Sequence, residues 1–204
     1  MSRRRTVPGV KGAKKRRHPY ALLLVDVINE LEFDGAARLL PRALAMARRV
    51  AALKARAIKA GVPCIYVNDN FGQWRSDFRT LVERCLTGGV RGQQIAQLLA
   101  PNDDDYFVLK PLHSGFYTTT LDLVLRELGS RRLVICGLAT EGCVLFTASD
   151  AYIRGFELFV PRDGSASESP ARHRHALDIM KKMLKADTRG CGAVRFSRPR
   201  GLRF

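Results

Sequence analysis

The sequence has no acidic residue near either of its ends. Residues 1–17 carry eight Lys or Arg and residues 189–204 carry five Arg, yet neither stretch contains Asp or Glu. The residues between them hold the other 22 basic residues and all 19 acidic ones, so their net charge is only +3, although the whole chain has a formal charge of +16. Runs of like charge repel one another and have little apolar surface to bury. We therefore expect a basic disordered arm at 1–18, one domain at 19–196 and a basic tail at 197–204.

The charge of this arm allows contact with the phosphates of nucleic acids. Its Lys and Arg residues are not interleaved with the aromatic side chains that stack on bases, so we rank nucleic-acid binding below a simple solvated arm. The sequence also lacks an apolar stretch long enough for a membrane span or for the apolar part of a signal peptide. These absences predict a cytoplasmic protein with no membrane contact.

Cysteine pairs at metal-binding or redox spacing are also missing. The five cysteines do not form any C-x-x-C pair, which argues against a zinc ribbon and a thioredoxin-type motif. In a reducing compartment they are free thiols, so each one is judged by its position. They are Cys64, Cys85, Cys136, Cys143 and Cys191.

Apolar runs alternate with helical patterns along the domain. The apolar runs do not alternate with polar residues, which is typical of parallel strands buried on both faces. The pattern predicts a three-layer α/β/α, Rossmann-like fold with a central, mostly parallel sheet of about six strands. Strands are expected at 21–27, 62–68, 106–110, 132–137, 156–163 and, at a sheet edge, 192–196. Helices are expected at 36–61, 75–86, 91–99, 118–129, 141–155 and 169–186.

Three chemically active side chains follow the ends of three predicted strands. Asp26 ends the first strand, Lys110 ends the third, and Cys143 follows the turn GLATEG after the fourth. Alone, each has an ordinary explanation: a loop cap, a solvated lysine and a small buried side chain. Ligands of open parallel sheets bind outside the carboxyl ends of the strands, where these three residues converge. Their convergence favours a functional site.

An acid, an amine and a thiol at one site suit nucleophilic catalysis. The start of a helix and a nearby Lys⁺ both favour the thiolate, which is the reactive form of cysteine. Asp26 can accept the thiol proton, and the thiolate can then attack an electrophilic carbon. Backbone N–H groups in the small-residue turn at Leu138, Ala139 and Thr140 are placed to hold the oxyanion that develops.

The segments that carry these residues resemble the isochorismatase-like cysteine hydrolase family. The resemblance covers roughly residues 20–185, so it concerns the whole domain. Its specific parts are a strand-end Asp, an upstream Lys-Pro and the pattern G-x-A-T-x-x-C-V. They lie in LLLVDVINELEF, VLKPLHSGFYTTTLDLVLRELG and LVICGLATEGCVLFTASDAYIRGFELFVPRDGSAS.

The resemblance implies a catalytic triad of Cys143 as nucleophile, Asp26 as proton acceptor and Lys110 as the cation that tunes both. It also implies a non-proline cis peptide bond between Leu138 and Ala139, a small-molecule substrate and a homo-oligomer, either dimer or tetramer. The leading function is hydrolysis of a small amide or ureido C–N bond through a thioester.

Histidine is missing where a metal-binding relative would have it. Nicotinamidases of this superfamily use an Asp-x-His motif after the second strand, but here Asp69 is followed by no His, and the four histidines are His18, His113, His173 and His175. We therefore expect no metal and no other cofactor, and we disfavour a nicotinamidase. His113, close to Lys110, is interpreted as a surface residue rather than one that orients substrate.

Polar and aromatic residues in the predicted loops suit a pocket for a small, partly apolar, planar substrate, although core packing explains each aromatic about equally well. The predicted substrate-binding residues are Asn29, Phe33, Phe71, Trp74, Phe116 and Tyr117.

Three alternatives to amide hydrolysis stay open. One is isochorismatase-type cleavage of a vinyl ether, which needs acid catalysis but no cysteine. Another is a nucleic-acid-binding or scaffold protein on a retained hydrolase fold. The third is a redox-sensing thiol, for which Cys136 would have to resolve an oxidised Cys143.

Overall fold

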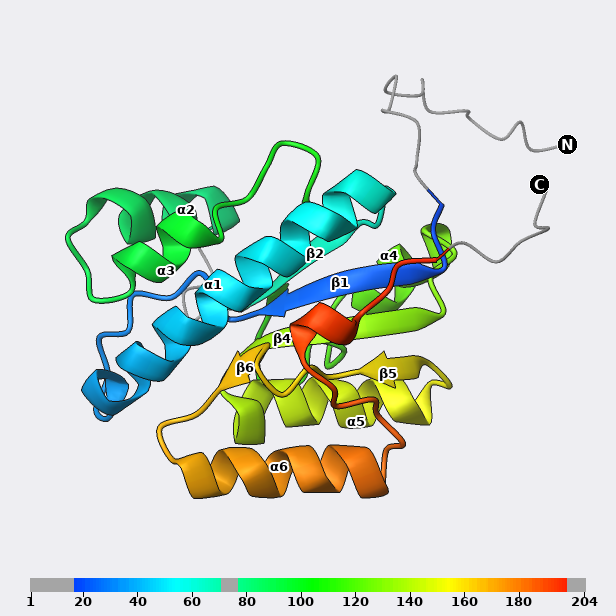
Figure 1. The fold of residues 1–204 in the computed structure, drawn as a ribbon. Coiled ribbons are helices and arrows are strands. Elements are labelled where there is room, and N and C mark those ends of the chain that lie inside the picture. The colour runs from blue at the N-terminus through cyan, green and yellow to red at the C-terminus, as the bar shows by residue number, and fades with distance from the viewer. Residues whose placement is uncertain (1–16, 71–76, 198–204) are drawn as a thin grey trace, which may run out of the picture.

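A six-stranded sheet forms the centre of the molecule (Figure 1). The structure is a computed structural model and describes residues 17–70 and 77–197. The strands run in the order β3-β2-β1-β4-β5, β6 also pairs with β4, and every pair is parallel. The six-stranded parallel sheet predicted from the sequence is therefore confirmed. The strands are β1 (Tyr20–Val25), β2 (Cys64–Asp69), β3 (Tyr106–Lys110), β4 (Arg132–Leu138), β5 (Glu157–Phe159) and β6 (Ser165–Ala166).

Helices cover both faces of this sheet (Figure 1). One buried cluster joins the sheet to α1 (Ala36–Ala60), α2 (Phe78–Thr87) and α3 (Gln93–Leu98). A second joins the opposite face to α4 (Leu121–Glu127), α5 (Leu145–Ile153) and α6 (Pro170–Lys182). Leu22 and Leu24 of β1 lie in the first cluster and Leu23 in the second, because successive side chains of a strand point to opposite faces. This arrangement explains why the strands read as continuous apolar runs.

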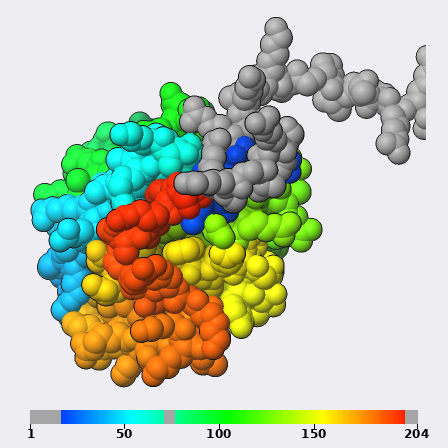
Figure 2. Space-filling view, turned by 45° about the vertical axis from the view of Figure 1, so that its right-hand side comes forward, coloured from blue at the N-terminus to red at the C-terminus, as the bar shows by residue number. Residues whose placement is uncertain are grey.

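The sixth strand is not where the sequence predicted it. Residues 192–196 form no strand; they include part of the 3₁₀-helix Cys191–Ala193, and the sixth strand is instead β6. The carbonyl groups of Cys191 and Val194 accept hydrogen bonds from the Arg56 guanidinium of α1, at 2.6 and 3.2 Å, rather than from a neighbouring strand. In Figure 2 this segment, in red, lies on the surface against the cyan atoms of α1.

The fifth strand is also shorter than the predicted 156–163. After Phe159 the chain leaves β4, and the Val160 N–H donates to the carbonyl of Asp187 at 2.9 Å. β5 pairs with Arg132–Val134 of β4, and β6 pairs with Gly137 and Leu138. Two short strands, β5 and β6, therefore pair with β4 at different points along its length.

Parts of the expected organisation lie outside the described residues. Residues 1–16 and 198–204, which include most of the predicted basic arm and tail, are among them. Within the ranges that the structure describes, no helix is long and apolar enough to cross a membrane.

β1 and β4 approach each other closely at their carboxyl ends. Val25 of β1 pairs with Gly137 of β4, whose φ is +134°, a conformation that side chains rarely adopt. A Cβ at Gly137 would lie 1.9 Å from the carbonyl oxygen of Val25. Only glycine therefore allows these strand ends to meet, and the candidate site lies directly beyond them.

Gly137→Ala should separate the two strand ends and lower the free energy of unfolding by about 3 kcal/mol or more. Gly192→Ala is the matched control, because a Cβ there meets no atom within 4 Å. Urea denaturation followed by circular dichroism measures both variants. Equal midpoints for the two would contradict the close approach of β1 and β4.

Candidate active site

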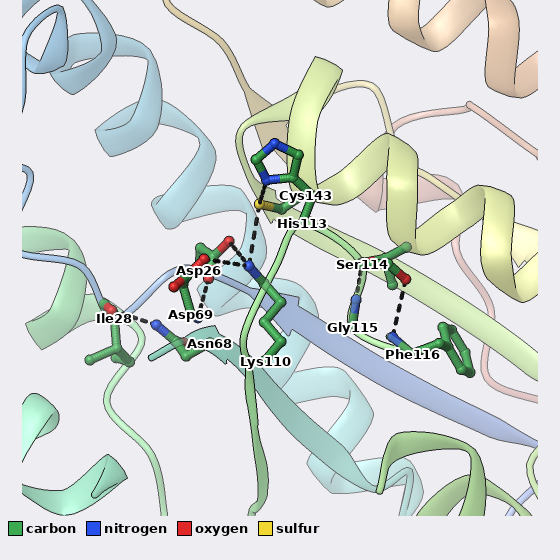
Figure 3. A network of polar contacts seen from close by, with 11 residues as sticks. Asp26, Ile28, Asn68, Asp69, Lys110, His113, Ser114, Gly115, Phe116 and Cys143 are labelled. Atoms are coloured by element: carbon green, nitrogen blue, oxygen red, sulfur yellow. Dashed lines mark hydrogen bonds and ion pairs between the residues drawn. The ribbon is translucent and has the colours of Figure 1, made fainter. Parts of the chain in front are cut away.

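A buried ammonium group connects the ends of three neighbouring strands (Figure 3). Lys110, the last residue of β3, has a fully buried side chain, and its Nζ lies 2.9 Å from Asp26 Oδ2. The same Nζ lies 3.3 Å from Oδ2 of Asp69, the last residue of β2. Asp26 follows β1 with a left-handed φ of 49°, and its Oδ1 accepts a hydrogen bond from the Asp69 N–H at 2.6 Å. The predicted pair of Asp26 and Lys110 is thus brought together, and Asp69 joins it.

The turn after β4 brings the thiol to the same ammonium group. The peptide bond between Leu138 and Ala139 is cis, as the resemblance implied. A short helical turn at Thr140–Val144, kinked at Gly142, follows and leads directly into α5. It carries Cys143, whose Sγ lies 3.3 Å from Lys110 Nζ. The three residues from separate strand ends therefore meet at one nitrogen atom.

The neighbouring groups of the site stabilise the charged form of Lys110. Burial is the largest single influence on Lys110 and lowers its pKa, but Asp26, Cys143 and Asp69 together outweigh burial, so the net pKa is raised. Burial raises the pKa of Asp26 more than Lys110 and the hydrogen bond from Cys143 lower it. The Asp26 carboxyl is thus a better proton acceptor than an exposed aspartate.

The thiol is protonated in the resting site. Burial, and then the negative charge of Asp26, raise the pKa of Cys143 to about 12, although Lys110 acts in the opposite direction. The sequence analysis expected the helix start and Lys110 to favour the thiolate. Lys110 does lower the pKa of Cys143, but burial and the neighbouring Asp26 carboxyl outweigh it. Burial, which the sequence analysis left out, therefore favours the neutral thiol.

A histidine lies on the other side of the sulfur. His113 Nδ1 is 3.9 Å from Cys143 Sγ (Figure 3). The His113 ring packs against Phe146, with the centroids 5.3 Å apart. The sequence interpretation took His113 for a surface residue. Its side chain is exposed, but it covers the nucleophile. The available sequence signal was its place three residues after Lys110.

Thr140 of the turn is held by a residue that the sequence analysis did not identify. Its hydroxyl lies 2.8 Å from Nδ1 of His173 in α6, and His173 Nε2 lies 3.0 Å from the carbonyl oxygen of Arg162. A carbonyl can only accept, so Nε2 carries the proton and Nδ1 accepts from the Thr140 hydroxyl. No local pattern reveals this contact, because the two residues are 33 positions apart.

The structure does not bring the predicted substrate-binding residues together in one pocket wall: some are exposed, one caps a loop, one is buried in the core and two are not described. Phe33 and Tyr117 are exposed, and the Asn29 side chain caps its own loop by accepting the Leu31 N–H at 2.8 Å. Phe116 is buried in the second core cluster, so the prediction that it lines the pocket is not supported. Its ring packs near Phe156, which explains its burial. Phe71 and Trp74 lie outside the described residues.

The positive charge in the described part of the site is the ammonium group of Lys110. Among residues 17–70 and 77–197, no group of three or more His, Cys, Asp or Glu is arranged to hold a metal. Asp69, which the sequence analysis compared with the metal-binding Asp of nicotinamidases, contacts Lys110.

The cysteine proposed as a redox partner lies on the wrong face of the sheet. Cys136 belongs to the first core cluster, whereas Cys143 packs against the second. The thiol neighbour of Cys136 is Cys191, whose hydrogen bond is the main cause of the raised pKa of Cys136. Cys136 is therefore not placed to resolve an oxidised Cys143.

Comparisons with known proteins show which family the chain resembles in sequence and in fold. The Isochorismatase domain family matches residues 20–188. The chain is 40% identical over 167 residues to the uncharacterized isochorismatase family protein YaaI of Bacillus subtilis, covering 82% of this chain and 91% of that protein. It is 38% identical over 88 residues to the ureidoacrylate amidohydrolase RutB of Methylorubrum extorquens, but this covers only 43% of the chain and 36% of the relative.

Among solved structures, N-carbamoylsarcosine amidase from Thermoplasma acidophilum superimposes with a TM-score of 0.67 and 27% identity, over 86% of this chain and 98% of that one. The nicotinamidase SaPncA from Staphylococcus aureus shares the fold, with a TM-score of 0.65 and 22% identity over 85% of this chain and 98% of that one.

Asp26→Asn and Lys110→Met should change the alkylation rate of Cys143 in opposite directions. Asp26 raises the pKa of Cys143, so its neutralisation should lower that pKa and make alkylation by iodoacetamide several-fold faster near neutral pH. Lys110→Met should slow alkylation, because the lysine lowers the same pKa. Peptide mass spectrometry follows Cys143, with the four buried thiols as internal references. Unchanged rates in both variants would show that these charges do not control the thiol.

Proposed function

The chain belongs to the isochorismatase family of hydrolases, and from this premise we propose that it cleaves a small amide or ureido C–N bond through a thioester on Cys143. The observation that carries this proposal is that Lys110 Nζ lies 2.9 Å from Asp26 Oδ2 and 3.3 Å from Cys143 Sγ. A thiol, a carboxyl group and an ammonium group therefore surround one point, which supports the roles of nucleophile, proton acceptor and fixed positive charge. Asp26, Lys110 and Cys143 are the proposed catalytic residues.

The first half of the reaction forms the thioester. The Cys143 thiol passes its proton to Asp26 as the sulfur attacks the substrate carbonyl, and Lys110 stabilises the negative charge that moves away from the carboxyl. The proton on Asp26 is then donated to the leaving nitrogen when the C–N bond breaks. A neutral resting thiol is compatible with this route, because deprotonation and attack occur together.

The turn before Cys143 is the proposed oxyanion site. Leu138, Ala139 and Thr140 lie between the end of β4 and the nucleophile, where backbone N–H groups can reach a carbonyl bonded to the sulfur. The hydrogen bond from the Thr140 hydroxyl to His173 holds this turn against α6.

Two relatives favour the amide and ureido class of substrate. Their names describe hydrolysis of a ureidoacrylate and of an N-carbamoyl compound, both of which contain a C–N bond next to a carbonyl. Vinyl-ether cleavage is the second candidate, and it needs no thiol. The contact of Cys143 with a charged pair favours the first candidate. We propose that the reaction needs no metal, because Lys110 supplies the positive charge at the site.

The remaining expectations stay predictions. A cytoplasmic location suits five unpaired cysteines. A homo-oligomer, either dimer or tetramer, is tested by sizing chromatography with light scattering, where a mass of one chain would contradict it. Binding of nucleic acid by the basic arm is tested by salt-dependent titration of the full chain.

Cys143→Ala should abolish amide hydrolysis, with a loss of at least about 10³-fold, because the covalent route is removed. The measurement is ammonia release from a panel of N-carbamoyl amino acids, ureido acids and primary amides. Cys85→Ala, which removes a buried thiol in α2, is the control and should keep activity. Hydrolysis that survives in Cys143→Ala would reject the thioester and favour the vinyl-ether candidate.

A further inference from the structure

The two sides of the Cys143 sulfur differ in their access to water. Asp26 and Lys110 lie on the protein side, where they are 5% and 0% exposed. Both oxygens of Asp26 already accept hydrogen bonds or ion pairs, Oδ1 from the Asp69 N–H and Oδ2 from Lys110. On the other side the exposed His113 imidazole lies 3.9 Å from the sulfur. The exposed His113 therefore lies on the solvent side of this sulfur.

The position of His113 is fixed by its neighbours in the chain. The Ser114 hydroxyl donates to the carboxylate of Asp150 in α5, and the Gly115 N–H donates to Thr147 Oγ1 at 3.0 Å. Phe146, on the first turn of the same helix, packs against the imidazole ring. Three contacts with α5 therefore hold His113 next to Cys143, which lies in the turn before this helix.

We propose that His113 is a further catalytic residue and the general base for the second half of the reaction, hydrolysis of the thioester. This inference rests on the proposed function, because it needs an acyl group on Cys143. Imidazole is suited to the role, since it can accept and return a proton near neutral pH.

The step balances without any further reactant. His113 Nδ1 takes a proton from water as the water oxygen bonds to the thioester carbon. The tetrahedral intermediate then collapses, the C–S bond breaks, and the sulfur receives the proton from the imidazolium. The products are the carboxylic acid, a neutral Cys143 thiol and a neutral His113. Since the thioester carbon is bonded directly to Sγ, the attacking water lies within reach of Nδ1.

The proposal divides the proton transfers between two groups. Asp26 faces the thiol from the protein interior and serves its activation and the departure of the leaving nitrogen. His113 faces the same sulfur from solvent and serves the incoming water. Loss of His113 should therefore slow deacylation and leave acylation almost unchanged.

His113→Asn and His113→Phe test this division. Asn keeps a polar group near the position of Nδ1, and Phe keeps the packing against Phe146, but neither side chain can act as a base. The probe is p-nitrophenyl acetate, which acetylates a reactive thiol and releases a coloured product. His175→Asn, an exposed histidine of α6, is the matched control.

In both His113 variants the burst of p-nitrophenolate should keep its rate within about threefold, while steady-state turnover falls about 100-fold, the lower end of what general bases contribute. Acetylated Cys143 should accumulate in peptide mass spectra, and added imidazole should restore part of the turnover. A structural role would instead slow acylation and deacylation together.

Two results would overturn the proposal, and they are distinguishable. If the wild type acetylates Cys143 but the variants show no accumulation and turn over at the wild-type rate, or lose both steps equally, His113 is not the base. If the wild type does not acetylate Cys143 at all, the proposed nucleophile is itself wrong and the role of His113 falls with it.

Discussion

The buried ammonium of Lys110 is the interaction on which the rest of the site depends. A lysine without access to water is costly unless opposite charges surround it. Asp26 and Asp69 supply those charges, 2.9 and 3.3 Å from Nζ. Because β3 lies two strands from β1, about 10 Å at ordinary strand spacing, only a long side chain can connect their ends. Lysine has that length, and it crosses above the end of β2, where Asp69 lies. The order of the strands in the sheet thus requires a long, positively charged side chain at the end of β3.

The same charge cluster determines how the thiol can react. Two carboxyl groups near one ammonium leave no excess positive charge to ionise Cys143, and burial opposes ionisation further, so the thiol stays protonated with a pKa of about 12. Its proton is nevertheless next to Asp26, a carboxyl whose own pKa is raised by burial. The site therefore combines a charged ion-pair cluster with a thiol whose pKa is raised. In the proposed reaction, the thiol proton moves when a substrate carbonyl is present to take the negative charge.

The features that the sequence predicts are those set by local patterns and by the general geometry of parallel sheets. The features that it does not predict depend on contacts between residues far apart in the chain. Parallel strands converge at one edge whatever their details, so strand ends alone were enough to bring Asp26, Lys110 and Cys143 together. The contact of Thr140 with His173 depends on how α6 packs, which no local pattern encodes. The apolar character of Phe116 is compatible with core or pocket, and only tertiary packing decides between them. Residues 192–196 have strand-like composition, but the carbonyls of Val194 and of the preceding Cys191 bind Arg56 of α1, a tertiary contact that the sequence does not show. The sequence shows the helix start and the lysine that favour the Cys143 thiolate, but it does not show the burial that raises the pKa of this thiol.

One helix links the two faces of the reaction. α5 begins two residues after Cys143, and its side chains Thr147 and Asp150 also bind the loop that carries His113. A displacement of this helix would therefore move the nucleophile and the histidine together, which keeps their separation constant.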